Sequence, residues 1–214
     1  MVVTKRIYEA NVLFAVALNS AKAIQATSRA GGQLPALVSL VFSAVSVEAF
    51  LNEAAEMGFS YSDMASEPEA VSVFAQCMME AEKSRAALES KLALANWVLV
   101  GKKLDTGAQP YQDFALIVRL RNDLMHFKGN ERFEPNVSPE EFHKKLIRGF
   151  GNRDLLAQDI EPGSWIHAIE TKAVAEWCCR TAAQVVVDFV SKAPHGVWRT
   201  FLEGIHRHFV PYAS

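Results

Sequence analysis

Three side chains suited to phosphodiester cleavage lie close together in the chain. They are Arg121, Asn122 and His126. A guanidinium binds phosphate through charge-assisted hydrogen bonds, and an imidazole transfers protons near neutral pH. Together these two groups are sufficient to cleave RNA without a metal ion, and the asparagine amide can orient either of them.

The flanking residues predict that these side chains lie on one helix, running from about Pro110 to about Lys128 and ending at Gly129. At about 100° per residue, Arg121 falls in the middle of an apolar stripe. The other members of this stripe are Phe114, Ile117, Val118, Leu124 and Met125. A charge in such a stripe is costly unless it is paired, so we expect an acidic partner on a neighbouring helix.

The best candidate for that partner is Glu48, on an earlier helix predicted over about residues 35–57. It lies near the centre of a second apolar stripe, formed by Leu37, Val41, Ala44, Leu51 and Ala55. Two interpretations of the pair stay open. In one, Glu48 only satisfies a core arginine; in the other, it orients the guanidinium while part of that group stays free to face a cleft.

A neighbouring face of the same helix carries Arg119, Asn122 and His126, because spacings of three, four and seven residues return to nearly the same side. A histidine beside a core stripe is often structural, but the nearby amide and two arginines favour a phosphate site. Arg121 and His126 subtend about 140° on an ideal helix. Their convergence therefore requires the long arginine side chain or a second subunit.

The pattern Arg-Asn-x-x-x-His formed by Arg121, Asn122 and His126 resembles the motif of the HEPN superfamily. Residues 43–53 resemble the early helix that many HEPN proteins carry before that motif. The resemblance covers about residues 34–190. It implies an all-α, up-and-down helical bundle and a homodimer in which two motif helices face one cleft.

The resemblance also implies an activity, that of a metal-independent endoribonuclease of the kind found in toxin and antiphage defence systems. In that chemistry the RNA 2′-hydroxyl attacks the adjacent phosphate, leaving a 2′,3′-cyclic phosphate and a 5′-hydroxyl. The expected roles are proton transfer for His126, phosphate binding for Arg121 and orientation of one of them for Asn122. Glu48 and Arg119 are expected to support these residues.

Two other classes of function stay open. Some HEPN proteins only bind nucleotides or mediate assembly, so a non-catalytic helical module is the alternative. A third possibility is that the chain neutralises or partners a toxin through an apolar helix in residues 195–214. That accessory helix is expected either to fold back on the bundle or to dock on a partner protein.

The net charge of −2 excludes a strongly basic nucleic-acid-binding protein, so any affinity for RNA must come from a local patch. Residues 119–153 carry eight basic and five acidic residues. Lys128 and Arg132, just after the motif, are the candidate RNA-binding residues of this segment. The alternative is an ordinary solvated face of mixed charge.

The chain of 214 residues predicts a single all-α domain, with four or five main helices and short additional ones. Further helices are expected over about residues 4–30, 68–81, 84–100, 138–148 and 164–193. Glycines are expected to end several of the helices, among them Gly58 and Gly101.

The remaining sequence features indicate a cytoplasmic protein without a metal or cofactor. The three cysteines form no disulfide framework, because two of them are adjacent and would bridge only with strain. Helical spacing at the N-terminus disfavours a signal peptide, and the apolar segment 34–47 is too short to span a bilayer. His195, His206 and His208 lack the cysteine or carboxylate ligands that would complete a metal site.

Overall fold

The described part of the chain contains helices and no strands, which confirms the predicted all-α class. The structure, a computed structural model, describes residues 8–24, 34–62, 64, 67–125, 148–150, 154–157 and 165–214. Its labelled α-helices are α1 (Glu9–Ala23), α2 (Leu34–Tyr61), α3 (Glu69–Lys83), α4 (Leu88–Val100), α5 (Tyr111–Met125), α7 (Trp165–Ile169), α8 (Lys172–Lys192) and α9 (Val197–Ile205). Two short 3-10 helices, η1 (His206–His208) and η2 (Val210–Tyr212), follow them.

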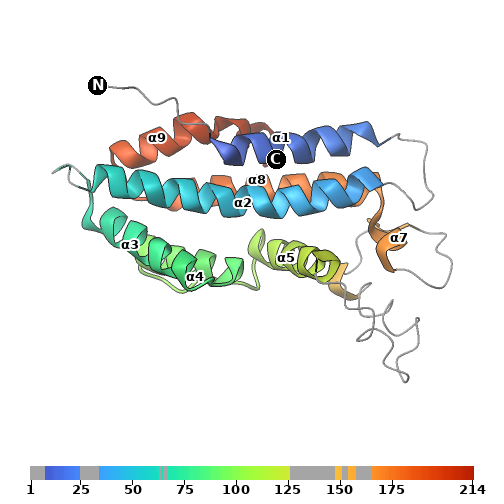
Figure 1. The fold of residues 1–214 in the computed structure, drawn as a ribbon, viewed down its shortest axis with the longest axis horizontal. Helices are drawn as coiled ribbons and strands as arrows, with labels where there is room; N and C mark the ends of the chain where they lie inside the picture. Colours follow the sequence, from blue (N-terminus) through green and yellow to red (C-terminus); the bar gives the residue numbers. More distant parts are fainter. Residues whose placement is uncertain are drawn as a thin grey trace, which may run out of the picture.

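The helices pack in layers around α2 and α8 (Figure 1). α1 and α9 lie along one side of this central pair, and α3, α4 and α5 lie along the other. The chain reverses direction between α1 and α2 and again between α2 and α3, as expected for an up-and-down arrangement. One cluster of buried side chains extends from Ala10 in α1 to Phe209 after η1, so both ends of the described chain share the same core.

Helix α2 is the central element of this core. Four of its apolar side chains, Ala44, Val47, Phe50 and Leu51, are completely buried. The apolar segment 34–47 forms the first half of this 28-residue helix, which by length and composition alone could cross a membrane. Half of the most apolar 18-residue stretch of α2 is buried inside the fold, which is the environment of a core helix.

Gly58 does not end α2, which corrects the expectation from sequence. The helix continues to Tyr61. A methyl group at Gly58 would lie 3.3 Å from Cγ1 of Val71 and 3.4 Å from Cβ of Ala75, both on α3. The glycine therefore permits close packing of two helices. Gly101, by contrast, follows the last residue of α4 as expected, in a left-handed conformation with φ of 70°.

The single helix predicted over residues 164–193 is divided into α7 and α8. Thr171 caps α8, because its hydroxyl accepts a hydrogen bond of 3.1 Å from the backbone N–H of Val174. The same hydroxyl donates to the carbonyl oxygen of Leu155 at 2.6 Å. These contacts stabilise a break that helical periodicity alone does not indicate.

The C-terminal segment folds back on the bundle, which is one of the two outcomes expected for it. Trp198 and Phe209 are completely buried, and the indole of Trp198 donates to the carbonyl oxygen of Ala54 at 3.0 Å. Glu67 accepts hydrogen bonds from the backbone N–H groups of Val197 (2.6 Å) and Trp198 (3.2 Å), at the start of α9. The bundle therefore covers most of this apolar face, while Phe201 stays exposed.

Helix α5, which carries the predicted motif, is held at its N-terminal end against α8. The hydroxyl of Tyr111 donates to Oδ2 of Asp188 at 2.6 Å, and the indole of Trp177 donates to Oδ2 of Asp113 at 2.9 Å. Burial and the contact with Asp188 raise the pKa of Tyr111, so its hydroxyl remains a donor. The first turn of α5 is thereby fixed against α8, and α5 also packs against α2.

Candidate functional site

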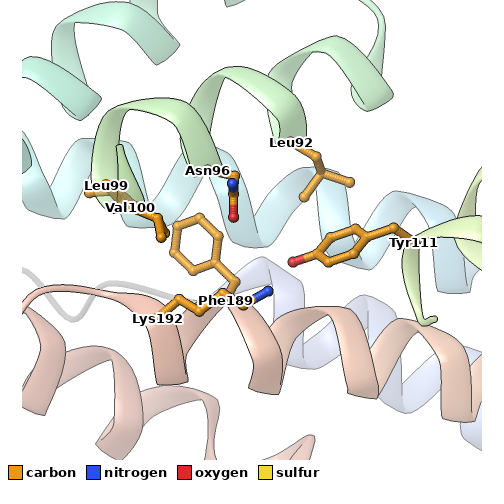
Figure 2. A pocket seen from close by; sticks show the side chains of 7 residues that line it. All are labelled: Leu92, Asn96, Leu99, Val100, Tyr111, Phe189 and Lys192. Carbon is orange, nitrogen blue, oxygen red and sulfur yellow. The ribbon is translucent and has the colours of Figure 1, made fainter. Parts of the chain in front are cut away.

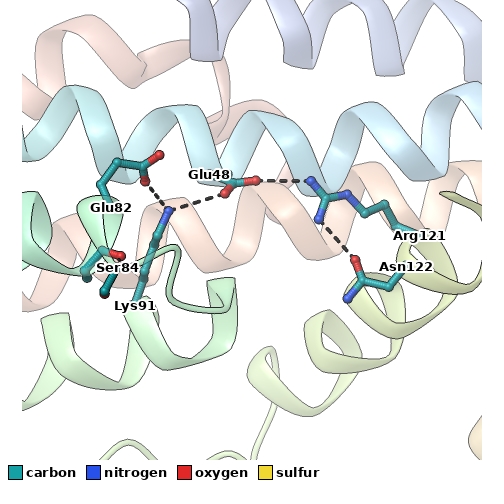
Figure 3. Close-up of polar contacts among 7 residues, drawn as sticks. Glu48, Glu82, Ser84, Lys91, Arg121 and Asn122 are labelled. Atoms are coloured by element: carbon teal, nitrogen blue, oxygen red, sulfur yellow. Dashed lines mark hydrogen bonds and ion pairs between the residues drawn. The ribbon is translucent and has the colours of Figure 1, made fainter. Parts of the chain in front are cut away.

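Arg121 and Glu48 contact each other, which confirms the predicted pairing. Nη2 of Arg121 lies 3.2 Å from Oε2 of Glu48 (Figure 3). Their side chains are 25% and 30% exposed, respectively. The pair therefore lies at the edge of the core, within reach of solvent, rather than sealed inside it.

Asn122 contacts the same guanidinium through a different nitrogen. Nη1 of Arg121 donates to Oδ1 of Asn122 at 3.2 Å, and the asparagine itself is exposed. The contacts with Glu48 and Asn122 use two of the five N–H donors of a guanidinium. Within the part of the chain that the structure describes, these two contacts orient the guanidinium plane and leave its other donors unoccupied.

The fully buried part of the α5 stripe ends before Arg121. Phe114, Ile117 and Val118 are buried, whereas Met125 is 65% exposed, so the expectation that Met125 belongs to the core stripe was wrong. In the last turn of α5, Leu124 is still partly buried against the core, whereas Met125 lies in solvent. Arg121 therefore lies where the fully buried part of the stripe gives way to partly buried and exposed residues.

Arg119 lies on the exposed side of α5, as Asn122 does. Its side chain passes over Gly149, where an added Cβ would lie 2.9 Å from Nη2 of Arg119. A larger residue at Gly149 would therefore displace this arginine. Arg119 and Asn122, the two described residues of the face predicted to carry His126, are therefore both accessible to solvent.

The other predicted site residues, His126, Lys128 and Arg132, lie outside the described residues. Helix α5 is described as far as Met125, the residue immediately before the histidine. Of the three motif residues, the structure therefore describes Arg121 and Asn122.

A second cation, Lys91 on α4, also contacts Glu48. Its Nζ lies 3.3 Å from Oε1 of Glu48 and forms a further hydrogen bond with Oε2 of Glu82 on α3. The side chain of Lys91 is only 3% exposed, whereas that of Glu82 is 57% exposed. The result is a chain of alternating charges from Glu82 through Lys91 and Glu48 to Arg121 (Figure 3).

Sequence reasoning did not identify Lys91, although a signal was present. The lysine lies among Leu88, Leu92 and Ala95, which are buried on α4. A charge in an apolar stripe needs a partner, and this argument had already linked the glutamate of α2 with the arginine of α5. The identity of its partners depended on how α4 packs against α2 and α3, which residue spacing does not reveal.

A small cavity lies at a different place, between α4, α5 and α8 (Figure 2). Its lining includes Leu92, Tyr111, Phe189 and Lys192. The volume is about 10 Å³, which is room for about one water molecule. Small-molecule sites usually have roughly 300 Å³ or more, so this cavity is too small to bind a nucleotide.

His206 is buried beside Glu53 on α2. Its Nε2 lies 3.9 Å from Oε2 of Glu53. Burial, assisted by the nearby His208, lowers the pKa of His206 to about 4, so the imidazole is neutral at physiological pH. Within the described ranges, no group of three or more His, Cys, Asp or Glu side chains is arranged to hold a metal ion.

Comparisons with known proteins do not assign the chain to a family. No family model, no curated protein and no solved structure matches the chain. The functional interpretation therefore depends on the sequence motif and on the contacts of Arg121.

Proposed function

We propose that this chain is a HEPN-like, metal-independent endoribonuclease. The observation that supports the proposal is the placement of Arg121, whose guanidinium is oriented by Glu48 and Asn122 at the partly exposed edge of the core. His126 follows five positions after the arginine in the sequence. The two side chains supply phosphate binding and proton transfer, which are the functions that RNA cleavage needs.

In the proposed reaction, a ribose 2′-oxygen attacks the adjacent phosphorus, and the bond from phosphorus to the 5′-oxygen of the next nucleotide breaks. The 2′-hydroxyl loses its proton and the departing 5′-oxygen gains one, which leaves a 2′,3′-cyclic phosphate and a 5′-hydroxyl. His126 carries out proton transfer. Arg121 offsets the negative charge on the phosphate oxygens in the transition state, while Asn122 and Glu48 keep its guanidinium in place.

The active unit in this proposal is a homodimer in which two copies of α5 face one cleft. One imidazole acts as a base or as an acid, so a second copy of His126 would complete the acid–base pair. The exposed side chains of Arg119, Asn122 and Met125, in the second half of α5, are available for this contact. A two-fold axis would present the same patch from both subunits.

Lys128 and Arg132 would extend the basic surface after the motif and bind the RNA backbone. Because the whole chain has a net charge of −2, this attraction would be local. Unrestrained RNA cleavage harms a cell, so the proposed role is that of a cytoplasmic toxin or antiphage effector. An antitoxin or another protein partner would then control it.

A non-catalytic helical module for nucleotide binding, dimerisation or partner binding is the second candidate function. One observation favours it: the ion pair with Glu48 is sufficient by itself to explain a charged Arg121 in an apolar stripe. The motif would then stabilise the fold or an assembly, and the protein would leave RNA intact.

Incubation of the purified protein with mixed single-stranded RNA in excess EDTA tests the proposal. The wild-type protein is expected to release fragments with 2′,3′-cyclic phosphate ends, and His126→Ala should lower the rate by roughly a hundredfold or more. His195 is exposed and provides the matched control, since His195→Ala should cleave at the wild-type rate. Cleavage that requires added divalent metal, or full activity of His126→Ala, would contradict the mechanism.

A further inference from the structure

Lys91 is the most deeply buried member of the charge chain that ends at Arg121. The lysine is almost completely buried, whereas Glu48 is partly exposed and Glu82 is mostly exposed. Transfer of an ammonium group out of water is costly, and contacts with carboxylates offset that cost. Because Glu48 belongs to α2 and Glu82 to α3, Lys91 connects α4 to both of these helices.

Glu48 carries a single negative charge but contacts two cations. Its Oε1 faces Lys91 at 3.3 Å and its Oε2 faces Arg121 at 3.2 Å. Figure 3 shows the carboxylate between the two basic groups. The charge of Lys91 offsets part of the field of this carboxylate, so Arg121 attracts an anion more strongly than it would in an isolated ion pair.

We propose that Lys91 is a positioning residue for the phosphate-binding site at Arg121. Lys91 holds Glu48 in the orientation that aligns the guanidinium, and its positive charge strengthens the attraction of the site for RNA phosphates. This inference rests on the proposed endoribonuclease function. Glu82 has the opposite electrostatic effect, because its carboxylate engages Lys91 from the solvent side and offsets part of its charge.

The proposal therefore predicts effects of opposite sign at Lys91 and Glu82. If the two residues only stabilised the packing of α3 and α4, loss of either one would lower both the stability of the protein and its activity. If Lys91 positions the site, loss of its charge weakens RNA binding, whereas loss of the Glu82 charge strengthens it. A purely structural role does not produce this difference in sign.

Steady-state cleavage of single-stranded RNA at low salt provides the test. Lys91→Met should raise KM about tenfold with a smaller change in kcat, and Glu82→Gln should lower KM about threefold. Lys83 and Glu80 form an exposed ion pair on α3 and supply matched controls of the same charge change. Lys83→Met and Glu80→Gln should both retain the wild-type KM. A rise in KM for both Lys91→Met and Glu82→Gln would overturn the proposal.

The arginine side-chain NMR spectrum separates failure of this inference from failure of the proposed function. The Nε–H resonance of Arg121, assigned by its loss in Arg121→Lys, should shift in Lys91→Met and in Glu82→Gln but not in Glu80→Gln. If the wild-type protein does not cleave RNA, the proposed function fails, and this spectrum still decides whether Lys91 positions Arg121. An unchanged resonance in both variants refutes the positioning role. If Lys91→Met does not fold, the comparison of Glu82→Gln with Glu80→Gln decides alone.

Discussion

Glu48 on α2 and Arg121 on α5 are 73 positions apart in the sequence, and their side chains meet at 3.2 Å. This contact joins the later turns of α5 to α2. Tyr111 and Asp188 join its first turn to α8 through a hydrogen bond of 2.6 Å. Polar contacts therefore hold α5 near both ends, and the orientation of the motif arginine depends on how three helices pack together.

Glu48→Gln should lower the free energy of unfolding by roughly 1 to 3 kcal/mol, because Lys91 and Arg121 both lose a charged partner. The partial exposure of Glu48 keeps the loss below that expected for a fully buried pair. Urea unfolding followed by circular dichroism measures the change. Glu56→Gln, on the exposed side of the same helix, should change stability by less than about 0.5 kcal/mol. Equal stability of the two variants would show that the ion pair contributes little.

Arg121→Lys should reduce RNA cleavage at least about tenfold, because lysine keeps the charge but lacks the planar group that binds through several nitrogens. In the wild-type protein, Glu48 and Asn122 contact different nitrogens of this guanidinium. Single-turnover rates measure the loss. Arg207→Lys changes an exposed arginine in η1 and should leave the rate unchanged. Wild-type cleavage by Arg121→Lys would show that a point charge is sufficient.

The stability of the protein should fall as the pH decreases from 6.5 to about 4, because of His206. Burial lowers the pKa of this imidazole from 6.5 to about 4 in the folded state. Below pH 6.5 the unfolded chain binds a proton that the folded chain does not bind, which favours unfolding. The loss levels off below the folded-state pKa and corresponds to roughly 3 kcal/mol.

His206→Gln should remove this contribution, so the difference in stability between wild type and variant should shrink as the pH is lowered. Glu53 acts with the opposite sign, because burial raises its pKa and its protonation in acid favours the folded state. Urea unfolding at several pH values between 7 and 4 therefore compares the wild-type protein with His206→Gln, and His195→Gln serves as the exposed control. Parallel stability curves for wild type and His206→Gln would rule out His206 as the source of the slope.

Sedimentation at micromolar concentration should give about twice the chain mass of 23.7 kDa, because the proposed active unit is a homodimer. Met125→Glu places a carboxylate on the exposed last turn of α5 and should shift the protein toward monomer, since like charges would meet across a two-fold axis. Met79→Glu changes an exposed methionine on α3 and is the control. A stable monomer that cleaves RNA would show that one chain forms the whole site. A dimer with His126 far from the two-fold axis would contradict the proposed active site.

The amino-acid sequence by itself determined the all-α class and the pairing of Glu48 with Arg121. Helical periodicity is a local property, so it indicates most helices without knowledge of their neighbours. An isolated charge in an apolar stripe is unfavourable wherever it lies, so each such charge needs a partner of opposite sign. Two opposite charges in two such stripes therefore predicted an ion pair. The predicted end of α4 at Gly101 was also correct, because a left-handed residue after a helix is a local requirement.

Only the tertiary structure decided which residues of those helices are buried and which residues contact another helix. Gly58 allows close contact with α3 instead of ending α2, and Met125 continues the helical period but lies in solvent. Lys91 joins the charge chain because α4 packs near both Glu48 and Glu82. Burial and ion-pair partners depend on contacts between segments distant in sequence, and the spacing of residues within one helix carries no information about which other helix covers it.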